Sequence, residues 1–278
     1  MLDITRFRIG RVLPLAVVLA LGGAGAAAQE APAQEVPAPA ASQPSAPAGE
    51  AAAPAQPILD QAVLDLLKTT TAQIAAAKGL EIGIRDLRDV PSDQGQTLIF
   101  VNEADIVVQR PDKLRLKGSI GGADTTVVYD GETLSIYDSE QNVVAKAEIA
   151  GTLDDMIAVA AEKYGVHFAF ADFLFSDPYA VLSKGLTHAY EAPTTELDAT
   201  DTRHLVFAAP GIEWQLWVDP ETSLPRMFAV TYTDRPGRPR FLVDFLSWDL
   251  DPEIEPGDFE LALPADASVI EFLPNDAQ

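Results

Sequence analysis

The chain has 278 residues, a formal net charge of −23 at pH 7 and no cysteine. This excess of acid opposes binding to nucleic acid or to an anionic lipid surface, and the lack of cysteine excludes disulfide bonds. At this length and with 47% hydrophobic residues, one sizeable core can form, and it must carry the stability alone.

The N-terminus has the pattern of an export signal. Residues 1–28 combine a basic start, an apolar run and an A-x-A cleavage site: Arg6, Arg8 and Arg11, then 12–21, then Ala26-Ala27-Ala28. The apolar run is shorter than the ~20 residues that span a bilayer, and no cysteine follows for lipid attachment. We therefore expect a cleaved signal peptide, a periplasmic location and no stable membrane insertion after cleavage.

Residues 29–57 consist almost entirely of Ala, Pro, Gln, Glu and Ser. Proline interrupts helices and the segment offers nothing for a core, so we expect a disordered or polyproline-like tether. Reach across the envelope is one role for it, but its composition favours an inert spacer. The folded domain is then residues 58–278.

The domain is expected to begin with a helix and two strands. Apolar residues recur at steps of three and four in the order Leu59, Val63, Leu66, Leu67, Thr70, Ile74, Ala77. Gly79 is expected to stop this helix. Residues 80–89 and 97–109 then read as strands on either side of a turn.

The stretch from Gln109 to Ile149 organises the rest of the chain. It reads as four or five short antiparallel strands joined by turns. Arg110-Pro111-Asp112 forms one turn, because proline fixes φ and holds the residue before it extended. Asp130-Gly131 is a strong hairpin signal, because glycine takes positive φ without steric cost.

Residues 152–184 are expected to hold two helices. Thr152 and Asp155 form a capping box and Gly165 ends the first helix, while Asp177-Pro178 begins the second. Between them lies a dense aromatic segment at 168–175. Inserted between two runs of strands, such a pair can cover one face or mouth of a curved sheet.

The C-terminal half is strand and turn throughout. The expected strands are 187–191, 203–208, 212–218, 226–233, 240–248 and 269–272. With the first half this makes about ten or eleven strands, and a sheet that long usually curls. The predicted fold is α+β: one curved antiparallel sheet in a half-barrel, covered by the N-terminal helix and the inserted helix pair.

Sequence motifs give no sign of an enzyme or a cofactor. The chain has no HExxH, GxSxG or phosphate-binding loop, and its three histidines, His167, His188 and His204, are scattered without metal-ligand spacing. Acidic residues are so frequent that a pair of them says little about acid–base catalysis. We expect a non-catalytic protein without cofactor or metal.

Large apolar side chains on alternate strand positions are the most informative feature. They are Trp214 and Leu216 on one strand, Phe228, Val230 and Tyr232 on the next, and Phe241, Val243 and Phe245 on a third. On a closed-up half-barrel they would line a concave interior. Sequence leaves open whether that interior is a ligand cavity or packed core.

Several motifs resemble known exported proteins. The Arg-Pro step, a short basic-apolar strand and Asp-Gly-x-x-Leu-x-x-Tyr-Asp resemble the middle of the lipoprotein carrier LolA and its relatives, LolB included. GTLDDMIAVAAEKYG (151–165), ADFLFSDPYAVL (171–182), HLVF (204–207), IEWQLWV (212–218) and FELALPADASV (259–269) resemble a family of predicted periplasmic proteins of the DUF2092 type. The carrier resemblance implies a lipid-binding half-barrel, and it links Arg110, the arginine of the Arg-Pro step, to lid opening. The tether, the inserted helices and the acidity depart from the carrier.

The leading hypothesis is an envelope protein that binds a lipid, an acylated protein or another apolar ligand in a concave face. One sixteen-carbon acyl chain is worth roughly 12 kcal/mol gross at ~0.8 kcal/mol per methylene, and association costs of ~4–15 kcal/mol remove much of it. Single-chain binding would thus be weak and reversible. The alternative is a structural or regulatory module that binds an envelope protein through the sheet face, without a ligand cavity.

Overall fold

The computed structural model describes residues 57–92, 94–120, 122–168 and 170–272. The predicted signal peptide (1–28) and nearly all of the predicted tether (29–57) lie outside the described residues. Among the residues described, no helix has both the length and the apolar character needed to cross a membrane.

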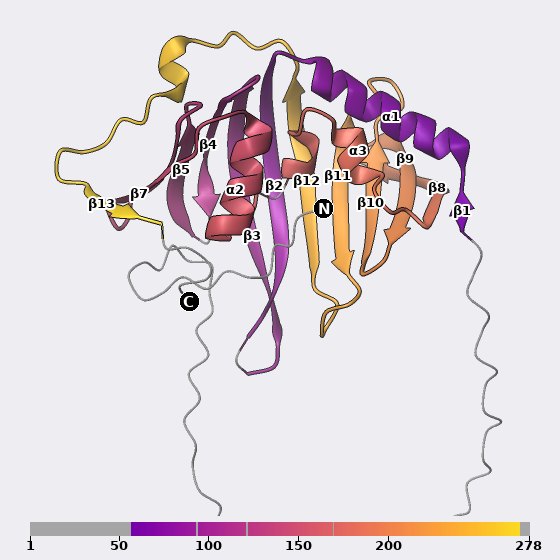
Figure 1. The fold of residues 1–278 in the computed structure, drawn as a ribbon. Coiled ribbons are helices and arrows are strands. Elements are labelled where there is room, and N and C mark those ends of the chain that lie inside the picture. The colour runs from indigo at the N-terminus through magenta and orange to yellow at the C-terminus, as the bar shows by residue number, and fades with distance from the viewer. Residues whose placement is uncertain (1–56, 93, 121, 169, 273–278) are drawn as a thin grey trace, which may run out of the picture.

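Thirteen strands form one sheet, in the order β1-β8-β9-β10-β11-β12-β2-β3-β4-β5-β6-β7-β13 (Figure 1). The first seven are β1 Ile58–Leu59, β2 Gly79–Pro91, β3 Thr97–Gln109, β4 Lys113–Ile120, β5 Ala123–Tyr129, β6 Thr133–Asp138 and β7 Val143–Glu148. The other six are β8 His188–Leu197, β9 Thr200–Ala209, β10 Ile212–Val218, β11 Pro225–Tyr232, β12 Arg240–Asp249 and β13 Ser268–Glu271. The sheet joins the two runs of strands through the pairing of β12 with β2.

The prediction of a single large sheet is confirmed, but the prediction that it is wholly antiparallel is wrong at both edges. β1 pairs with β8 in parallel and β13 pairs with β7 in parallel. Both edge strands are reached through long connections rather than hairpins, and such connections allow parallel pairing. The expected ten or eleven strands fall short of thirteen. The two-residue edge strand β1 is too short to show alternation, whereas β13 was expected at 269–272.

The predicted helices exist, but both ends of the first differ from the prediction, and Leu59 lies in β1 rather than in the helix. The helices are α1 Gln61–Ala76, α2 Leu153–Tyr164 and α3 Pro178–Leu182, with 3₁₀ turns η1 Ala171–Phe173 and η2 Pro256–Phe259. Thr152 and Asp155 form the expected capping box, and Gly165 ends α2 with a φ of 67°. Gly79 does not end α1: it begins β2, where its backbone lies against Ile254.

One hydrophobic cluster joins the helices to one face of the sheet, here called the inner face. Buried residues of α1 (such as Leu67) and α2 (such as Met156) belong to the same cluster as strand residues from both halves of the sheet. In the view of Figure 1, α2 and α3 lie in front of the sheet and α1 runs along its upper end. Gln73 fixes that end of the sheet, because its side-chain amide donates to the carbonyls of Thr222 and Ser223 between β10 and β11.

The opposite, outer face carries a separate small cluster. Phe259 of η2 packs with Val107 of β3 and Val128 of β5, and all three are buried. Beside them, Arg115 and Asp258 form an ion pair with a 2.7 Å N–O distance. The C-terminal segment from β12 to β13 thus packs on the outer face of the N-terminal strands.

Candidate functional site

The structure brings the eight apolar site candidates together on the inner face. Strand register places them in rows: Leu216 lies opposite Phe228 and Phe228 opposite Val243, and in the row below Trp214 lies opposite Val230 and Val230 opposite Phe241. The eight buried candidates are Trp214, Leu216, Phe228, Val230, Tyr232, Phe241, Val243 and Phe245. Their role in ligand binding remains a prediction.

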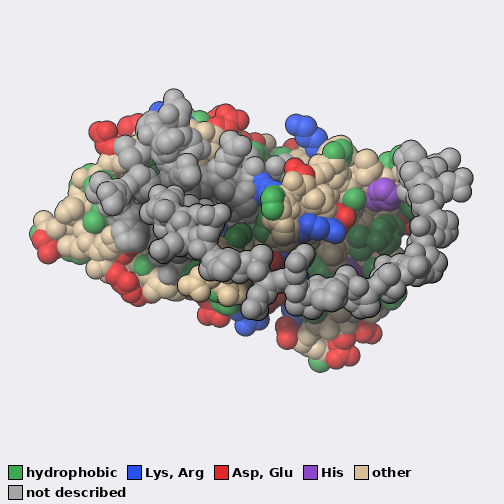
Figure 2. Space-filling view, turned by 90° about the horizontal axis from the view of Figure 1, so that it is seen from below, with side chains coloured by type: hydrophobic (Ala, Val, Ile, Leu, Met, Phe, Trp, Pro, Cys, Tyr) green, Lys and Arg blue, Asp and Glu red, His purple; other side chains and the backbone are tan. Residues whose placement is uncertain are grey.

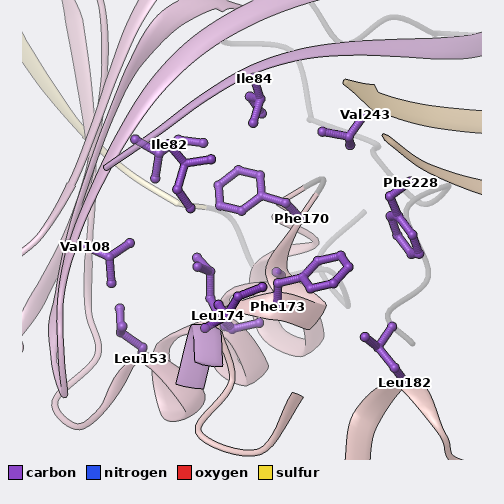
Figure 3. Close-up of a cluster of buried hydrophobic side chains, with 14 of the residues drawn as sticks. Ile82, Ile84, Val108, Leu153, Phe170, Phe173, Leu174, Leu182, Phe228 and Val243 are labelled. Atoms are coloured by element: carbon purple, nitrogen blue, oxygen red, sulfur yellow. The ribbon is translucent and has the colours of Figure 1, made fainter. Parts of the chain in front are cut away.

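Part of this inner face is already occupied by residues 170–182, which hold η1 and α3 and are here called the lid segment. The ring of Phe173 lies edge-on to Phe228 at 5.2 Å and to Phe245 at 5.7 Å between centroids. Figure 3 shows Phe170 and Phe173 pointing toward strand residues such as Ile84 and Phe228. Around Phe173 the inner face is therefore packed core.

The lower end of the inner face, away from α1, is different. In Figure 2 this end shows hydrophobic side chains deep in a hollow, in the half of the molecule that holds β8 to β12. Tyr232 and Phe241 are the last apolar candidates toward this end, one row or more below Phe228. Space for an apolar ligand is thus to be sought beside Val230, Tyr232 and Phe241 rather than beneath Phe173.

Polar side chains interrupt the apolar face at this lower end. Asp86 of β2 is buried and accepts from Arg88 Nε at 2.7 Å and from Asn102 Nδ2 at 3.1 Å. The guanidinium of Arg88 lies over the Phe241 ring, with Cζ 5.7 Å from the ring centroid. Arg235, in the turn after β11, lies over Tyr232 at 4.0 Å. Two arginines therefore cover the two lowest aromatic rings of the face.

Arg110, the site candidate implied by the carrier resemblance, reaches the lid segment. Its Nη1 donates to the backbone oxygen of Leu174 at 2.7 Å. Its Nε and Nη2 are buried and have no hydrogen-bond partner among the described residues. Burial lowers the pKa of this guanidinium from its ordinary value, and the charge of Asp154 on α2 acts in the opposite direction. One hydrogen bond to the lid segment and the charge of Asp154 therefore offset part of the cost of burying this cation.

The lid segment also holds a buried acid. Asp172 of η1 is buried, and its Oδ1 has no hydrogen-bond partner among the described residues. Burial raises the pKa of this carboxyl. Burying the charged carboxylate without a partner costs free energy. The side chain of Asp172 therefore destabilises the closed position of the lid segment.

Among the described residues, the other titratable groups form no arrangement typical of a catalytic site. His204 lies on the outer face, where Nε2 is 2.8 Å from Gln215 Oε1 and the ring stacks on Trp217 at 4.2 Å. Within the described ranges, no three His, Asp or Glu residues gather where they could hold a metal ion.

Sequence reasoning missed Asp86, Arg88 and Arg235. A signal was present for two of them, since Asp86 and Arg88 occupy alternate positions of a strand whose other inner residues, such as Ile82 and Ile84, are apolar. Arg235 could not be found this way, because its place over Tyr232 depends on the path of a turn.

Comparison with known proteins places the chain in a family. The family described as "Predicted periplasmic protein (DUF2092)" matches residues 64–273, and the chain belongs to it. No curated protein matches the chain.

The solved structures to which the chain is similar are remote in sequence. An uncharacterized conserved protein from Thermus thermophilus is 10% identical with a TM-score of 0.45, covering 76% of this chain and 99% of that one. The lipoprotein LppX of Mycobacterium tuberculosis is 12% identical with a TM-score of 0.45, covering 71% and 100%. A LolA superfamily protein from Nitrosomonas europaea is 7% identical with a TM-score of 0.36, covering 72% and 97%. No residue role is transferred from these proteins.

Proposed function

We propose that this protein is an exported, non-catalytic binder of a lipid, an acylated protein or another apolar ligand. The sheet would act as a half-barrel that receives the ligand on its inner face, and the lid segment would move to admit it. Export would use residues 1–28, with residues 29–57 as a spacer. No cofactor and no nucleic acid enters this proposal.

The observation that carries the proposal is the contact between Arg110 and the lid segment. A residue that served only to fill the core would not be a cation whose Nε and Nη2 have no hydrogen-bond partner among the described residues. A single hydrogen bond to the Leu174 carbonyl can break when the lid segment moves, and the guanidinium then gains water or a ligand. Arg110 would thus hold the closed state weakly enough for it to open.

The inner face is tested by one matched pair of substitutions. Val230 of β11 and Val127 of β5 are both buried inner-face residues. If ligand space adjoins Val230, then Val230→Trp should abolish binding of a fluorescent fatty-acid probe and leave the free energy of unfolding nearly unchanged. Val127→Trp should overpack the N-terminal half and cost about 1–3 kcal/mol or more.

The two readouts separate the outcomes. Probe fluorescence gives the affinity, and urea unfolding gives the stability of each variant. If the parent binds no probe and Val230→Trp is as destabilising as Val127→Trp, the inner face is packed core and the ligand proposal fails.

A second candidate function is binding of an envelope protein through the outer face. There, strand register aligns Leu242 of β12 with Leu87 of β2 and Leu87 with Val101 of β3. Val101 is 54% exposed, and contiguous exposed apolar patches mark interaction surfaces. Val101→Glu should then abolish cross-linking to a partner protein in the periplasm, while binding of the fatty-acid probe persists. Capture that is unaffected by this change would reject the outer-face candidate.

A further inference from the structure

We propose that two copies of this protein associate through a free edge of β3, in the hairpin that β2 and β3 form. The hairpin extends below the rest of the sheet (Figure 1). Its lower part, residues 89–91 of β2 and 97–102 of β3, is here called the arm. The inference concerns an interaction surface, and it does not depend on ligand binding to the inner face.

One edge of the arm has no strand beside it. β2 pairs with all 13 residues of β3. On the other side of β3, β4 pairs only with residues 103–109. Among the strands that the structure describes, none therefore lies beside residues 97–102 on the side away from β2.

The register of the hairpin shows which backbone groups point to this free edge. In an antiparallel pair, hydrogen-bonded and non-hydrogen-bonded positions alternate. Arg110 N donates to Lys78 O at one end of the hairpin, and Ser92 N donates to Gln96 O at the other, both at 2.8 Å. Both bonds fit the register in which even-numbered residues of β3 bond to β2. The N–H and C=O groups of the odd-numbered residues therefore point to the free edge. These residues are Thr97, Ile99 and Val101.

No feature of this segment protects the edge from pairing with another strand. Sheet edges are usually protected by short strands, charges, proline or bulges. The outermost strands β1 and β13 have only two and four residues, but residues 97–102 form a regular strand without charge or proline. Leu98 and Ile99, on opposite faces of the arm, are 45% and 59% exposed. The arm therefore exposes apolar side chains beside an unpaired edge, which is typical of an interaction surface.

A second copy fits this edge, because the segment is complementary to itself. If two copies pair in antiparallel orientation about Ile99, Thr97 of each copy lies opposite Val101 of the other. Leu98 then lies opposite Phe100. This register uses all three backbone positions at the edge and brings apolar side chains together on both faces. The contact is the same for both copies, so it closes at a dimer.

The acidity of the chain does not prevent this contact. The net charge of −23 makes two copies repel each other, but residues 94–102 carry no charge. In the proposed register Glu103 of one copy lies opposite Gly95 of the other, so no like charges face each other along the edge. Salt screens the remaining repulsion. The paired edge is short, so we expect a reversible dimer rather than a permanent one.

Sedimentation of the purified protein without residues 1–28, over a range of concentrations, is the first measurement. We expect a monomer–dimer equilibrium that shifts toward the dimer as NaCl is raised, because salt screens the repulsion between acidic copies. A protein that stays monomeric at every concentration would overturn the inference and leave both candidate functions intact. An association that salt weakens would rest on ion pairs rather than on the uncharged edge, and it would also overturn the inference.

A matched pair of substitutions at Ile99 tests the edge itself. Ile99→Pro removes the N–H that faces the second copy, and an edge strand tolerates proline at such a position. It should weaken dimerisation by about tenfold or more, because each dimer loses two hydrogen bonds. Ile99→Thr keeps the N–H and the β-branched shape, so its effect should be smaller. Urea unfolding checks that both variants keep the fold. Equal effects of the two substitutions, or no effect of either, would show that the copies do not pair through this backbone edge.

Single cysteines test the position of the two-fold axis and do not depend on the proline variant. The chain has no cysteine, so a disulfide in a single-cysteine variant must join two copies. Opposite residues in a hydrogen-bonded pair have Cα atoms about 5.5 Å apart, and a disulfide can span that distance. Ile99→Cys should therefore form a covalent dimer on mild oxidation, whereas Leu246→Cys, at another exposed apolar position, should not. Equal cross-linking of the two variants would indicate random collision and would overturn the proposed pairing.

Discussion

The two halves of the sheet are built differently. In the N-terminal half, β2 to β7, α2 contributes buried residues to the inner face and Phe259 packs on the outer face. In the C-terminal half, β8 to β12, the inner face carries large aromatic residues, and two arginines lie over its lower rings. We propose from this difference that the N-terminal half supplies stability and that the inner face of the C-terminal half receives the ligand.

The largest expected effect is in the N-terminal half. Leu134 of β6 is fully buried on the inner face, so Leu134→Ala should lower the free energy of unfolding by about 2–5 kcal/mol. Probe affinity should stay within about twofold of the parent, because this residue lies outside the proposed site. Urea unfolding and probe titration check both statements. A variant with full stability and lost binding would break the comparison between the halves.

A smaller loss is expected from the outer-face cluster. Phe259→Ala should cost about 2–3 kcal/mol, below the ~3–5 kcal/mol of a Phe enclosed in a large core, because its cluster has only three buried members. Hydrogen exchange should also become faster in β13, which follows Phe259 along the chain. Leu261→Ala, at a partly buried neighbour, should have a weaker effect. Unchanged stability of the Phe259 variant would show that the outer cluster is not part of the scaffold.

The hairpin between β5 and β6 is expected to be next in sensitivity. Gly131 has a φ of 97°, and an added Cβ would lie 3.0 Å from Asp112 Oδ2. Gly131→Val should therefore cost about 1–3 kcal/mol. Gly95 has a similar φ of 84° with nothing within 4 Å of an added Cβ, so Gly95→Val measures the backbone cost alone. Thermal unfolding of the two variants should differ; equal melting temperatures would remove the role of the Asp112 contact.

Features that depend on neighbouring residues in the chain could be predicted from the sequence. The capping box at Thr152 and Asp155 and the positive φ of Gly131 each follow from a few adjacent residues. Alternation along single strands likewise predicted that Phe228, Val230 and Tyr232 share a face, as the register shows. These local signals were enough for one large sheet with helices inserted between two runs of strands.

Features that depend on distant segments could not be predicted. The bond from Arg110 to Leu174 joins residues 64 positions apart, and no spacing rule connects them. β1 is too short for a periodic pattern, and the residues of β13 do not show that it pairs in parallel with β7. Gly79 was assigned to the helix end because the close approach of Ile254 to it cannot be seen in the sequence. Alternation identifies the face on which Val243 lies but not whether space remains beside it, so cavity and core stayed equally open.

The smallest expected effect concerns the lid segment, where a substitution changes the proposed binding half without replacing a strand residue. Burial raises the pKa of Asp172 in the folded protein. Below the pKa of about 3.9 that an Asp has in the unfolded chain, the carboxyl is protonated in both the folded and the unfolded state. In that pH range Asp172 does not change the free energy of unfolding. As the pH rises, the unfolded chain ionises first and the folded protein loses stability. Asp172→Asn stays neutral, so its melting temperature should match that of the parent near pH 3 and exceed it at pH 7, where the free energy of unfolding should be higher by about 1 kcal/mol. Glu162→Gln, at an exposed acid on α2, should show no such gain. A more stable closed lid segment should also slow probe entry into the Asp172→Asn variant; unchanged entry would mean that ligands reach the inner face without moving the lid segment.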